Sequence, residues 1–195
     1  MPGVVDEQRA LLAEWQELSK RQFDIYADRW ATGQISLQEF ERLFKAELKD
    51  LHIATTWVAR GTTQFDRAAN GLAGRRLRDQ YGFMHDFFRE IEAGNLTLAE
   101  IKARSGLYAK SSGQVLEQIG ISETDLPRLP AYPKDGSTRC LTNCNCTIRK
   151  VKVTNGWDVY WDLNPGETCP DCKGRADRSP LQVRFGRIVN PEAWD

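Results

Sequence analysis

The chain has 195 residues, 27 basic and 27 acidic side chains, and a formal net charge of zero. A balanced charge provides no global field to attract nucleic acid or an anionic membrane. No stretch approaches the roughly 18 apolar residues that a membrane span needs, and the first 15 residues lack the pattern of a secretory signal. We therefore expect a soluble protein from a reducing cytoplasm, with one main hydrophobic core and a second, smaller unit.

The first third of the chain predicts two helices. Apolar side chains recur every three or four residues over 5–30, as on one face of an amphipathic helix, and "ATGQ" (31–34) interrupts the pattern. Ser36 then opens a second helix, and Glu39 stands at the spacing of a capping box.

Two further helices are predicted before residue 120. The glycine-rich stretch 60–74 lacks a clear period, so we expect a loop there with at most a short helix. A third helix is predicted over about 75–93. A fourth follows Thr97, again with a glutamate, Glu100, at capping-box spacing, and should run to about residue 119.

The turns between these helices resemble each other. "GQISLQEF" (33–40) and "GNLTLAEI" (94–101) share a glycine, an amide, an aliphatic residue, a hydroxyl, a leucine and a glutamate in the same order. Glycine ends a helix in the left-handed conformation, and the hydroxyl caps the next helix. The match predicts a four-helix core built from a duplicated hairpin, or two capped helix pairs that converged on the same residues.

The composition of the sequence changes at residue 121. The segment 121–136 contains three prolines and no apolar period, so it predicts an extended linker. The aromatic residues Tyr132, Phe185 and Trp194 lie in this arm and in the tail, where we expect segments 121–136 and 180–195 to order against a partner or a second copy.

A small β unit is predicted after the linker. Ile148, Val151 and Val153 lie in a β-branched run, Asn155-Gly156 is a hairpin signal, and an aromatic run follows. The fold class is therefore α+β, with N-terminal helical hairpins and a small C-terminal cysteine-rich, zinc-ribbon-like β-hairpin. The predicted parts are a helical domain (1–120), a linker (121–136) and a β unit with its tail (137–195).

All five cysteines lie in this β unit. Cys140, Cys144 and Cys146 precede the predicted hairpin, and Cys169 and Cys172 follow it as "CPDC". A hairpin brings its two ends together, and two cysteine groups that meet there resemble the sulfur cage of a zinc ribbon. We expect a structural zinc ion on Cys169 and Cys172 with two of the other three thiols, which would stabilise a unit too small to bury much core.

Two other uses of these thiols stay open at this point. One is a structural disulfide, and the other is a redox pair at Cys169 and Cys172. Other catalysis has little basis in the sequence. The chain has two histidines, His52 and His85, both on predicted helices, and no phosphate-binding, zinc-protease or nucleophile-elbow motif. We therefore predict that the protein is not an enzyme.

Two cysteine elements carry a family resemblance. "LYAKSSGQVLEQ" (107–118) ends a helical region, and "TNCNCT" (142–147), a tryptophan-bearing hairpin and "CPDCKGRAD" (169–177) follow. This arrangement resembles the minor head or head-morphogenesis proteins of tailed phages, the Mu F-like group. In that group the CPxC element usually comes first, whereas here it comes second.

The resemblance implies a structural role in the virion or in head assembly. Its expected partners are portal and capsid proteins, and other copies of the same chain in a homo-oligomer. It implies the phage head or head–tail junction as the location, after assembly in the host cytoplasm. The alternative is a zinc-ribbon adaptor for nucleic acid or a transcription factor. Residues 131–195 carry ten basic and eight acidic side chains, a balance that does not favour a phosphate binder.

Overall fold

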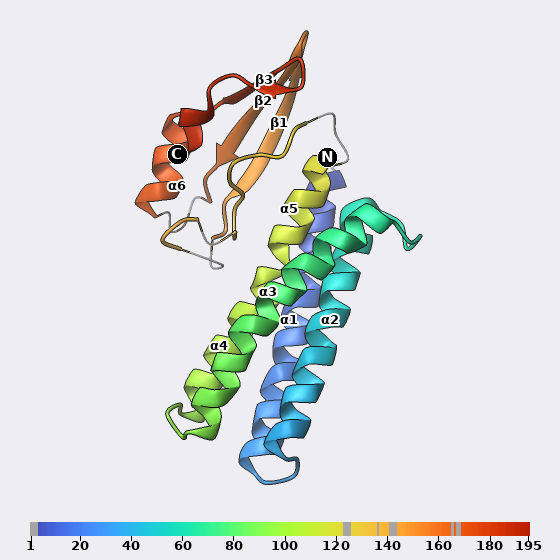
Figure 1. The fold of residues 1–195 in the computed structure, drawn as a ribbon, viewed down its shortest axis with the longest axis vertical. Coiled ribbons are helices and arrows are strands. Elements are labelled where there is room, and N and C mark those ends of the chain that lie inside the picture. Colours follow the sequence, from blue (N-terminus) through green and yellow to red (C-terminus); the bar gives the residue numbers. More distant parts are fainter. Residues whose placement is uncertain (1–3, 123–125, 136, 141–143, 165, 167–168) are drawn as a thin grey trace. The chain divides into compact units, whose positions relative to one another are not determined.

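The computed structural model (Figure 1) describes residues 4–122, 126–135, 137–140, 144–164, 166 and 169–195. The chain divides into two compact units, Met1–Val115 and Leu116–Asp195. The first is helical and the second contains an antiparallel sheet, so the predicted α+β class is confirmed. Residues 123–125 and 136 of the predicted linker lie outside the described residues.

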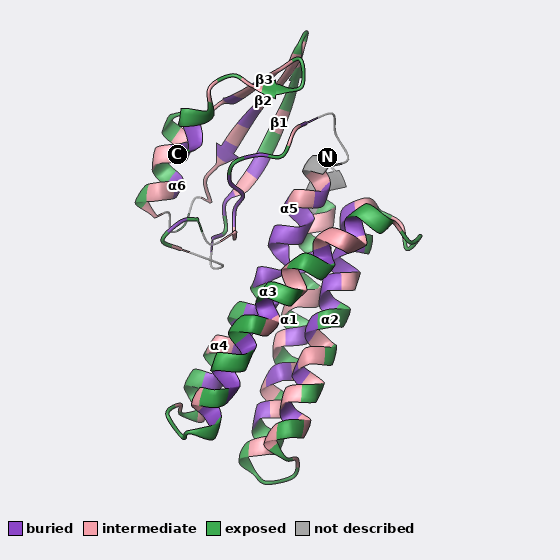
Figure 2. Ribbon diagram, viewed as in Figure 1, coloured by how far each residue is buried: buried purple, intermediate pink, exposed green. Residues whose placement is uncertain are grey.

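The first unit is a bundle of four helices. They are α1 (Val4–Ala31), α2 (Leu37–Arg60), α3 (Arg67–Glu92) and α4 (Leu98–Ser111). Helix α1 packs against α2 and α4, and α2 also packs against α3. Each helix turns a buried stripe toward the others and leaves an exposed face outside (Figure 2).

Aromatic rings hold the centre of the bundle. Phe44 of α2 stacks on Phe23 of α1, with ring centroids 3.9 Å apart, and meets Phe88 of α3 and Tyr108 of α4 edge to face. Phe23 and Phe44 are fully buried. One side chain of α2 thus contacts the three other helices of the bundle, and aromatic pairs of this kind add stability beyond the area they bury.

The two hairpin turns have the same conformation, as their shared sequence predicted. Gly33 and Gly94 both adopt left-handed φ angles, of 72° and 71°. In each turn the glycine N–H donates to the carbonyl three residues back, and the next N–H donates to the carbonyl five residues back. These bonds satisfy the last carbonyls of α1 and α3.

The helices that follow these turns are capped differently. At α4, Thr97 Oγ1 accepts the N–H of Glu100, and the Glu100 carboxylate accepts the N–H of Thr97, which completes the predicted capping box. At α2, Ser36 accepts the N–H of Glu39 as predicted. The reciprocal half is wrong there, because the Glu39 carboxylate is paired with Arg42.

Two predicted helix boundaries are wrong. Helix α3 begins at Arg67, eight residues early, because the Asp66 carboxylate accepts the N–H of Ala69 and caps it. The predicted fourth helix is two helices, because the chain breaks at Ser112 before α5 (Gly113–Ser122). The hydroxyls of Ser111 and Ser112 bond back to carbonyls of α4, a pattern that bends helices.

The second unit contains a four-stranded antiparallel sheet. Its strands are β1 (Thr147–Val153), β2 (Gly156–Asp162), β3 (Leu181–Arg184) and β4 (Arg187–Ile188), and they lie in sequence order. Helix α6 (Pro170–Asp177) connects β2 to β3, and the 3-10 helix η2 (Pro191–Trp194) ends the chain. Sequence patterns predicted only the first two strands of this sheet.

The hairpin turn lies one residue earlier than predicted. Val153 pairs with Gly156, so the two loop residues are Thr154 and Asn155, and Gly156 begins β2. A Cβ at Gly156 would lie 2.0 Å from the carbonyl oxygen of Val183 in β3. Glycine is required here because the backbone of the third strand approaches so closely.

Four residues of the predicted linker belong to the core of the second unit. Leu126, Leu129, Ala131 and Tyr132 are buried in one cluster with the sheet, together with Trp194. The expectation that Tyr132 and Trp194 need a partner is therefore wrong. Phe185 differs, because it is 80% exposed at the turn between β3 and β4.

Candidate metal centre

The β1–β2 hairpin brings the two cysteine groups together, as its topology predicted. Thr147 pairs with Asp162 at the open end of the hairpin. Cys146 directly precedes β1, and the chain after β2 leads to α6, whose N-terminal turn contains Cys172. The thiols upstream and downstream of the hairpin thus meet at its open end.

The sulfur atoms form a connected cluster. Cys172 lies at its centre, with its Sγ atom 3.7 Å from that of Cys140 and 3.6 Å from that of Cys144. The Sγ atoms of Cys140, Cys144 and Cys172 all lie within 4.8 Å of one another. Cys169 lies at the edge of the cluster: its Sγ atom is 3.5 Å from that of Cys140, but it is not within 4.8 Å of all three sulfurs of that group.

These separations suit a metal ion. A tetrahedral site with metal–sulfur bonds of about 2.3 Å has sulfur–sulfur edges of about 3.8 Å. Three of the six sulfur–sulfur distances among Cys140, Cys144, Cys169 and Cys172 are 3.5 to 3.7 Å, close to that value and far from the bond length of about 2.05 Å in a disulfide. All five cysteines are free thiols in the structure. The cluster is therefore compatible with a structural metal.

Helix α6 fixes two of the thiols by its own capping. Cys169 is the N-cap residue, and its Sγ atom accepts the backbone N–H of Cys172 at 3.5 Å. Pro170 follows at the first helical position, where a missing N–H breaks no helical hydrogen bond. The positive end of the helix and this donated N–H both favour a thiolate at Cys169.

An acidic residue of the same turn positions the third thiol. The Asp171 carboxylate accepts the backbone N–H of Arg139 at 2.7 Å and lies 3.6 Å from the Arg139 guanidinium. Cys140 follows directly, and its sulfur lies 3.1 Å from the hydroxyl of Thr138. Asp171 therefore ties the segment before Cys140 to the first turn of α6, which sequence reasoning did not predict.

The pKa values of the thiols are shifted in opposite directions. Hydrogen bonds from Cys144 lower the pKa of Cys146 to about 5, and the same interaction, with burial, raises the pKa of Cys144. Burial opposes ionisation of Cys169, but hydrogen bonds from Cys172 and Cys140 outweigh it and bring its pKa to about 7. Burial raises the pKa of Cys172. Without metal, the raised pKa values keep Cys144 and Cys172 as thiols at neutral pH, whereas the lowered pKa favours the thiolate at Cys146.

A buried arginine lies one helical turn beyond Cys172. The Arg175 guanidinium stacks over the Trp161 ring at 4.9 Å, donates to the carbonyl of Trp194 at 3.1 Å and donates to the Ser137 hydroxyl at 2.8 Å. It forms no ion pair with a carboxylate in the described part of the chain. Spacing alone did not distinguish Arg175 from the other basic residues of the tail.

Comparison of the chain with protein-family models, with curated proteins and with solved structures gives no match. Within the described residues, no helix is both long enough and apolar enough to cross a membrane. The functional inference consequently depends on the residues and geometry of this chain.

Proposed function

We propose that Cys140, Cys144, Cys169 and Cys172 bind one structural zinc ion that stabilises the C-terminal unit. Three of the six separations between these sulfur atoms carry this proposal, because they approach the edges of a tetrahedral site. Thiolate ligands suit zinc, and the reducing cytoplasm expected from the sequence keeps them reduced.

Cys169 is preferred over Cys146 as the fourth ligand. Cys169 belongs to a Cys-x-x-Cys turn whose own N–H donates to the sulfur, the arrangement that supports bound thiolates in zinc ribbons. Cys146 is buried and hydrogen-bonds with Cys144. In this assignment Cys146 supports a ligand rather than binding the ion.

Arg175 supports the charge balance of such a site. Zinc with four thiolates carries a net charge of minus two, which is costly to bury without compensation. Arg175 is a buried cation on the same helix as Cys172, and its described hydrogen bonds go to neutral groups. A nearby anionic centre would offset the buried charge of this guanidinium.

The assignment is tested by serine substitutions in protein purified under reducing conditions. Elemental analysis should find one zinc per chain in the parent and in Cys146→Ser. Cys169→Ser and Cys172→Ser should each lose most of the zinc. Full retention by Cys169→Ser with loss by Cys146→Ser would exchange the roles of these two residues.

We further propose that the chain is a structural, non-enzymatic minor head protein of a tailed phage. The resemblance of "TNCNCT" and "CPDCKGRAD" to the cysteine elements of that family supports this role, as does their placement after a helical region. Its partners would be the portal and capsid proteins. Quantitative mass spectrometry of purified heads should find a few copies per particle, and absence from both immature and mature heads would contradict the role.

A thiol oxidoreductase is the second candidate, and one observation favours it. Cys169 lies at a helix N-terminus with a pKa of about 7, as reactive cysteines do. However, the flanking strands β2 and β3 are antiparallel, unlike the βαβ setting of that chemistry. Catalytic reduction of insulin disulfides by the chain, lost in Cys169→Ser, would favour this candidate over a structural site.

A further inference from the structure

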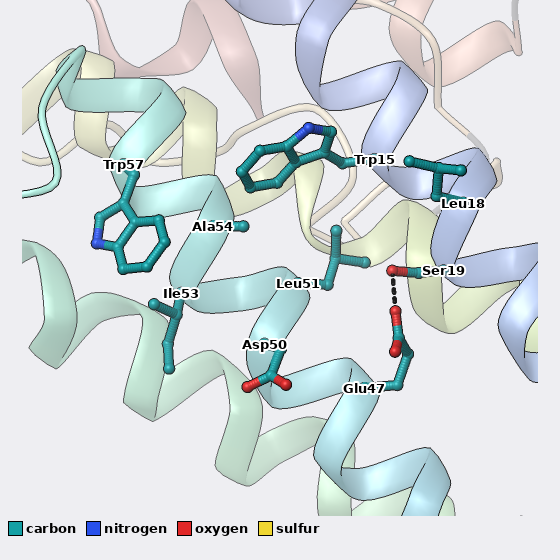
Figure 3. A pocket seen from close by; sticks show the side chains of 9 residues that line it. All are labelled: Trp15, Leu18, Ser19, Glu47, Asp50, Leu51, Ile53, Ala54 and Trp57. Carbon is teal, nitrogen blue, oxygen red and sulfur yellow. Dashed lines mark hydrogen bonds between the residues drawn. The ribbon is translucent and has the colours of Figure 1, made fainter.

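A groove opens on the helical unit between α1 and α2 (Figure 3). It has a volume of about 560 Å³, and Trp15, Leu18, Leu51 and Trp57 supply much of its apolar lining. Leu18 is 59% exposed and Trp57 is 38% exposed. Large apolar side chains that line an open groove are typical of a surface that a partner covers.

The apolar surface continues along α1 beyond the groove. Leu11, Leu18 and Ile25 are all exposed and stand seven residues apart, so they lie on one face of the helix. The residues of α1 that enter the bundle core, such as Leu12 and Phe23, lie on another face and are buried. The helix thus has a second apolar stripe that its own bundle does not use.

Two carboxylates give the groove a charge. Glu47 and Asp50 belong to its lining, and none of the nine lining residues is basic. Glu47 accepts a hydrogen bond from the Ser19 hydroxyl at 2.6 Å (Figure 3). Neither carboxylate forms an ion pair with any residue that the structure describes. The groove is therefore apolar and locally acidic in a chain of zero net charge.

We propose that this groove docks an amphipathic helix of a partner protein that has lysine or arginine beside its apolar face. Residues 47 to 57 of α2 extend over about 15 Å, enough for nearly three turns of a docked helix. Leucine-like residues at i, i+3 or i+4, and i+7 would fill the groove, and the basic residues would pair with Glu47 and Asp50. Such pairing complements the groove in charge as well as in shape.

Charge also argues against a second copy of the chain in this place. A symmetric contact between two copies uses the same patch on both. It would bring Glu47 and Asp50 of one copy into the same buried patch as those of the other, and like charges in an interface are strongly unfavourable. The inference does not depend on the zinc site, which lies in the other unit.

The test uses fluorescein-labelled helical peptides of 14 residues and the full chain. A panel of four peptides carries leucine at i, i+3 and i+7, with two lysines at different flanking positions, and four matched peptides carry glutamate instead. Fluorescence anisotropy should show binding by at least one lysine peptide and by no glutamate peptide. Added salt should weaken the binding, because exposed charge pairs are screened.

Variants locate the binding to the groove. Leu18→Ser and Asp50→Lys change exposed side chains, so the bundle should stay folded, and each should reduce the affinity about tenfold. Phe83→Ser is the matched control, since Phe83 is an equally exposed apolar residue, 62% accessible, on α3 outside the groove. This control should bind like the parent.

Four results would overturn the proposal. They are failure of all lysine peptides to bind at 1 mM, equal binding of the glutamate peptides, and affinity unchanged in both groove variants. The fourth is self-association of the parent, seen in sedimentation, that Leu18→Ser abolishes, because this result would assign the groove to a second copy.

Discussion

His52 of α2 is buried, and neither of its ring nitrogens has a hydrogen-bond partner in the described structure. Burial, with a smaller contribution from the Arg76 charge, lowers its pKa from 6.5 to about 4. The unfolded chain therefore binds a proton between pH 6.5 and 4 that the folded chain excludes. The stabilising effect of neutral His52 is present above pH 6.5 and is lost as the pH falls toward 4.

This shift predicts acid sensitivity of the helical unit. Between pH 7 and 5, His52 should contribute a loss of about 2 kcal/mol in the free energy of unfolding. His52→Leu should remove that part of the loss in urea titrations at the two pH values. His85→Leu, at an exposed position, is the control and should keep the pH dependence of the parent. Equal pH dependence in the parent and His52→Leu would contradict the assignment.

In the C-terminal unit, Arg175 is likewise a buried side chain that can carry a charge. Arg175→Met should destabilise that unit by about 3 kcal/mol, because the Trp194 carbonyl and the Ser137 hydroxyl lose a buried, charged donor. Lysine at this position should not restore the stability, since it lacks the planar fork that reaches both groups. Tryptophan fluorescence in urea would measure the change, with the exposed Arg187→Met as a control.

The helix caps differ in ways that substitution can resolve. Ser36→Ala removes one hydrogen bond and should cost about 1 kcal/mol. Thr97→Ala also breaks the reciprocal box with Glu100, so it should cost roughly 1.5 kcal/mol. Thermal melting of the two variants beside the parent would rank them, and a melting curve for Thr97→Ala identical to that of the parent would contradict the cap.

Local signals predicted the elements that local chemistry determines. The helix turns at Gly33 and Gly94 followed from residues only a few positions apart, and so did the caps at Ser36 and Thr97. The start of α3 was missed because Asp66 caps a helix whose first turns are rich in alanine and glycine rather than in a periodic apolar pattern.

Several contacts around the cysteine cluster depend on the tertiary fold and could not be predicted from the sequence. The cysteine spacing and the hairpin predicted that the two thiol groups meet. The ties from Asp171 to Arg139, and from Arg175 to Trp194, join residues 19 or more positions apart, so no local pattern indicates them. The burial of Tyr132 also depends on the finished core rather than on its proline-rich neighbours.

At the scale of the whole molecule, the two units should respond differently to metal removal. The helical unit has an aromatic core of its own, whereas the thiol cluster belongs to the core of the second unit. A chelator should therefore unfold residues 116–195 and leave the helices of residues 4–111 folded. Two-dimensional NMR would show the loss of dispersed amide signals from the C-terminal unit alone.

The control for this experiment is Cys172→Ser, which should resemble the chelated parent before any chelator is added. Unfolding of both units on chelation would show that the helical unit depends on the metal. An unchanged spectrum would show that the C-terminal unit folds without it.

X-ray absorption at the zinc edge tests the central claim most directly. The sample is the full chain purified under reducing conditions, with its zinc content measured on the same material. The account predicts one zinc per chain, bound by four sulfur atoms at about 2.3 Å. Protein without zinc, or zinc bound mainly by nitrogen and oxygen, would contradict a tetrahedral thiolate site built from these cysteines.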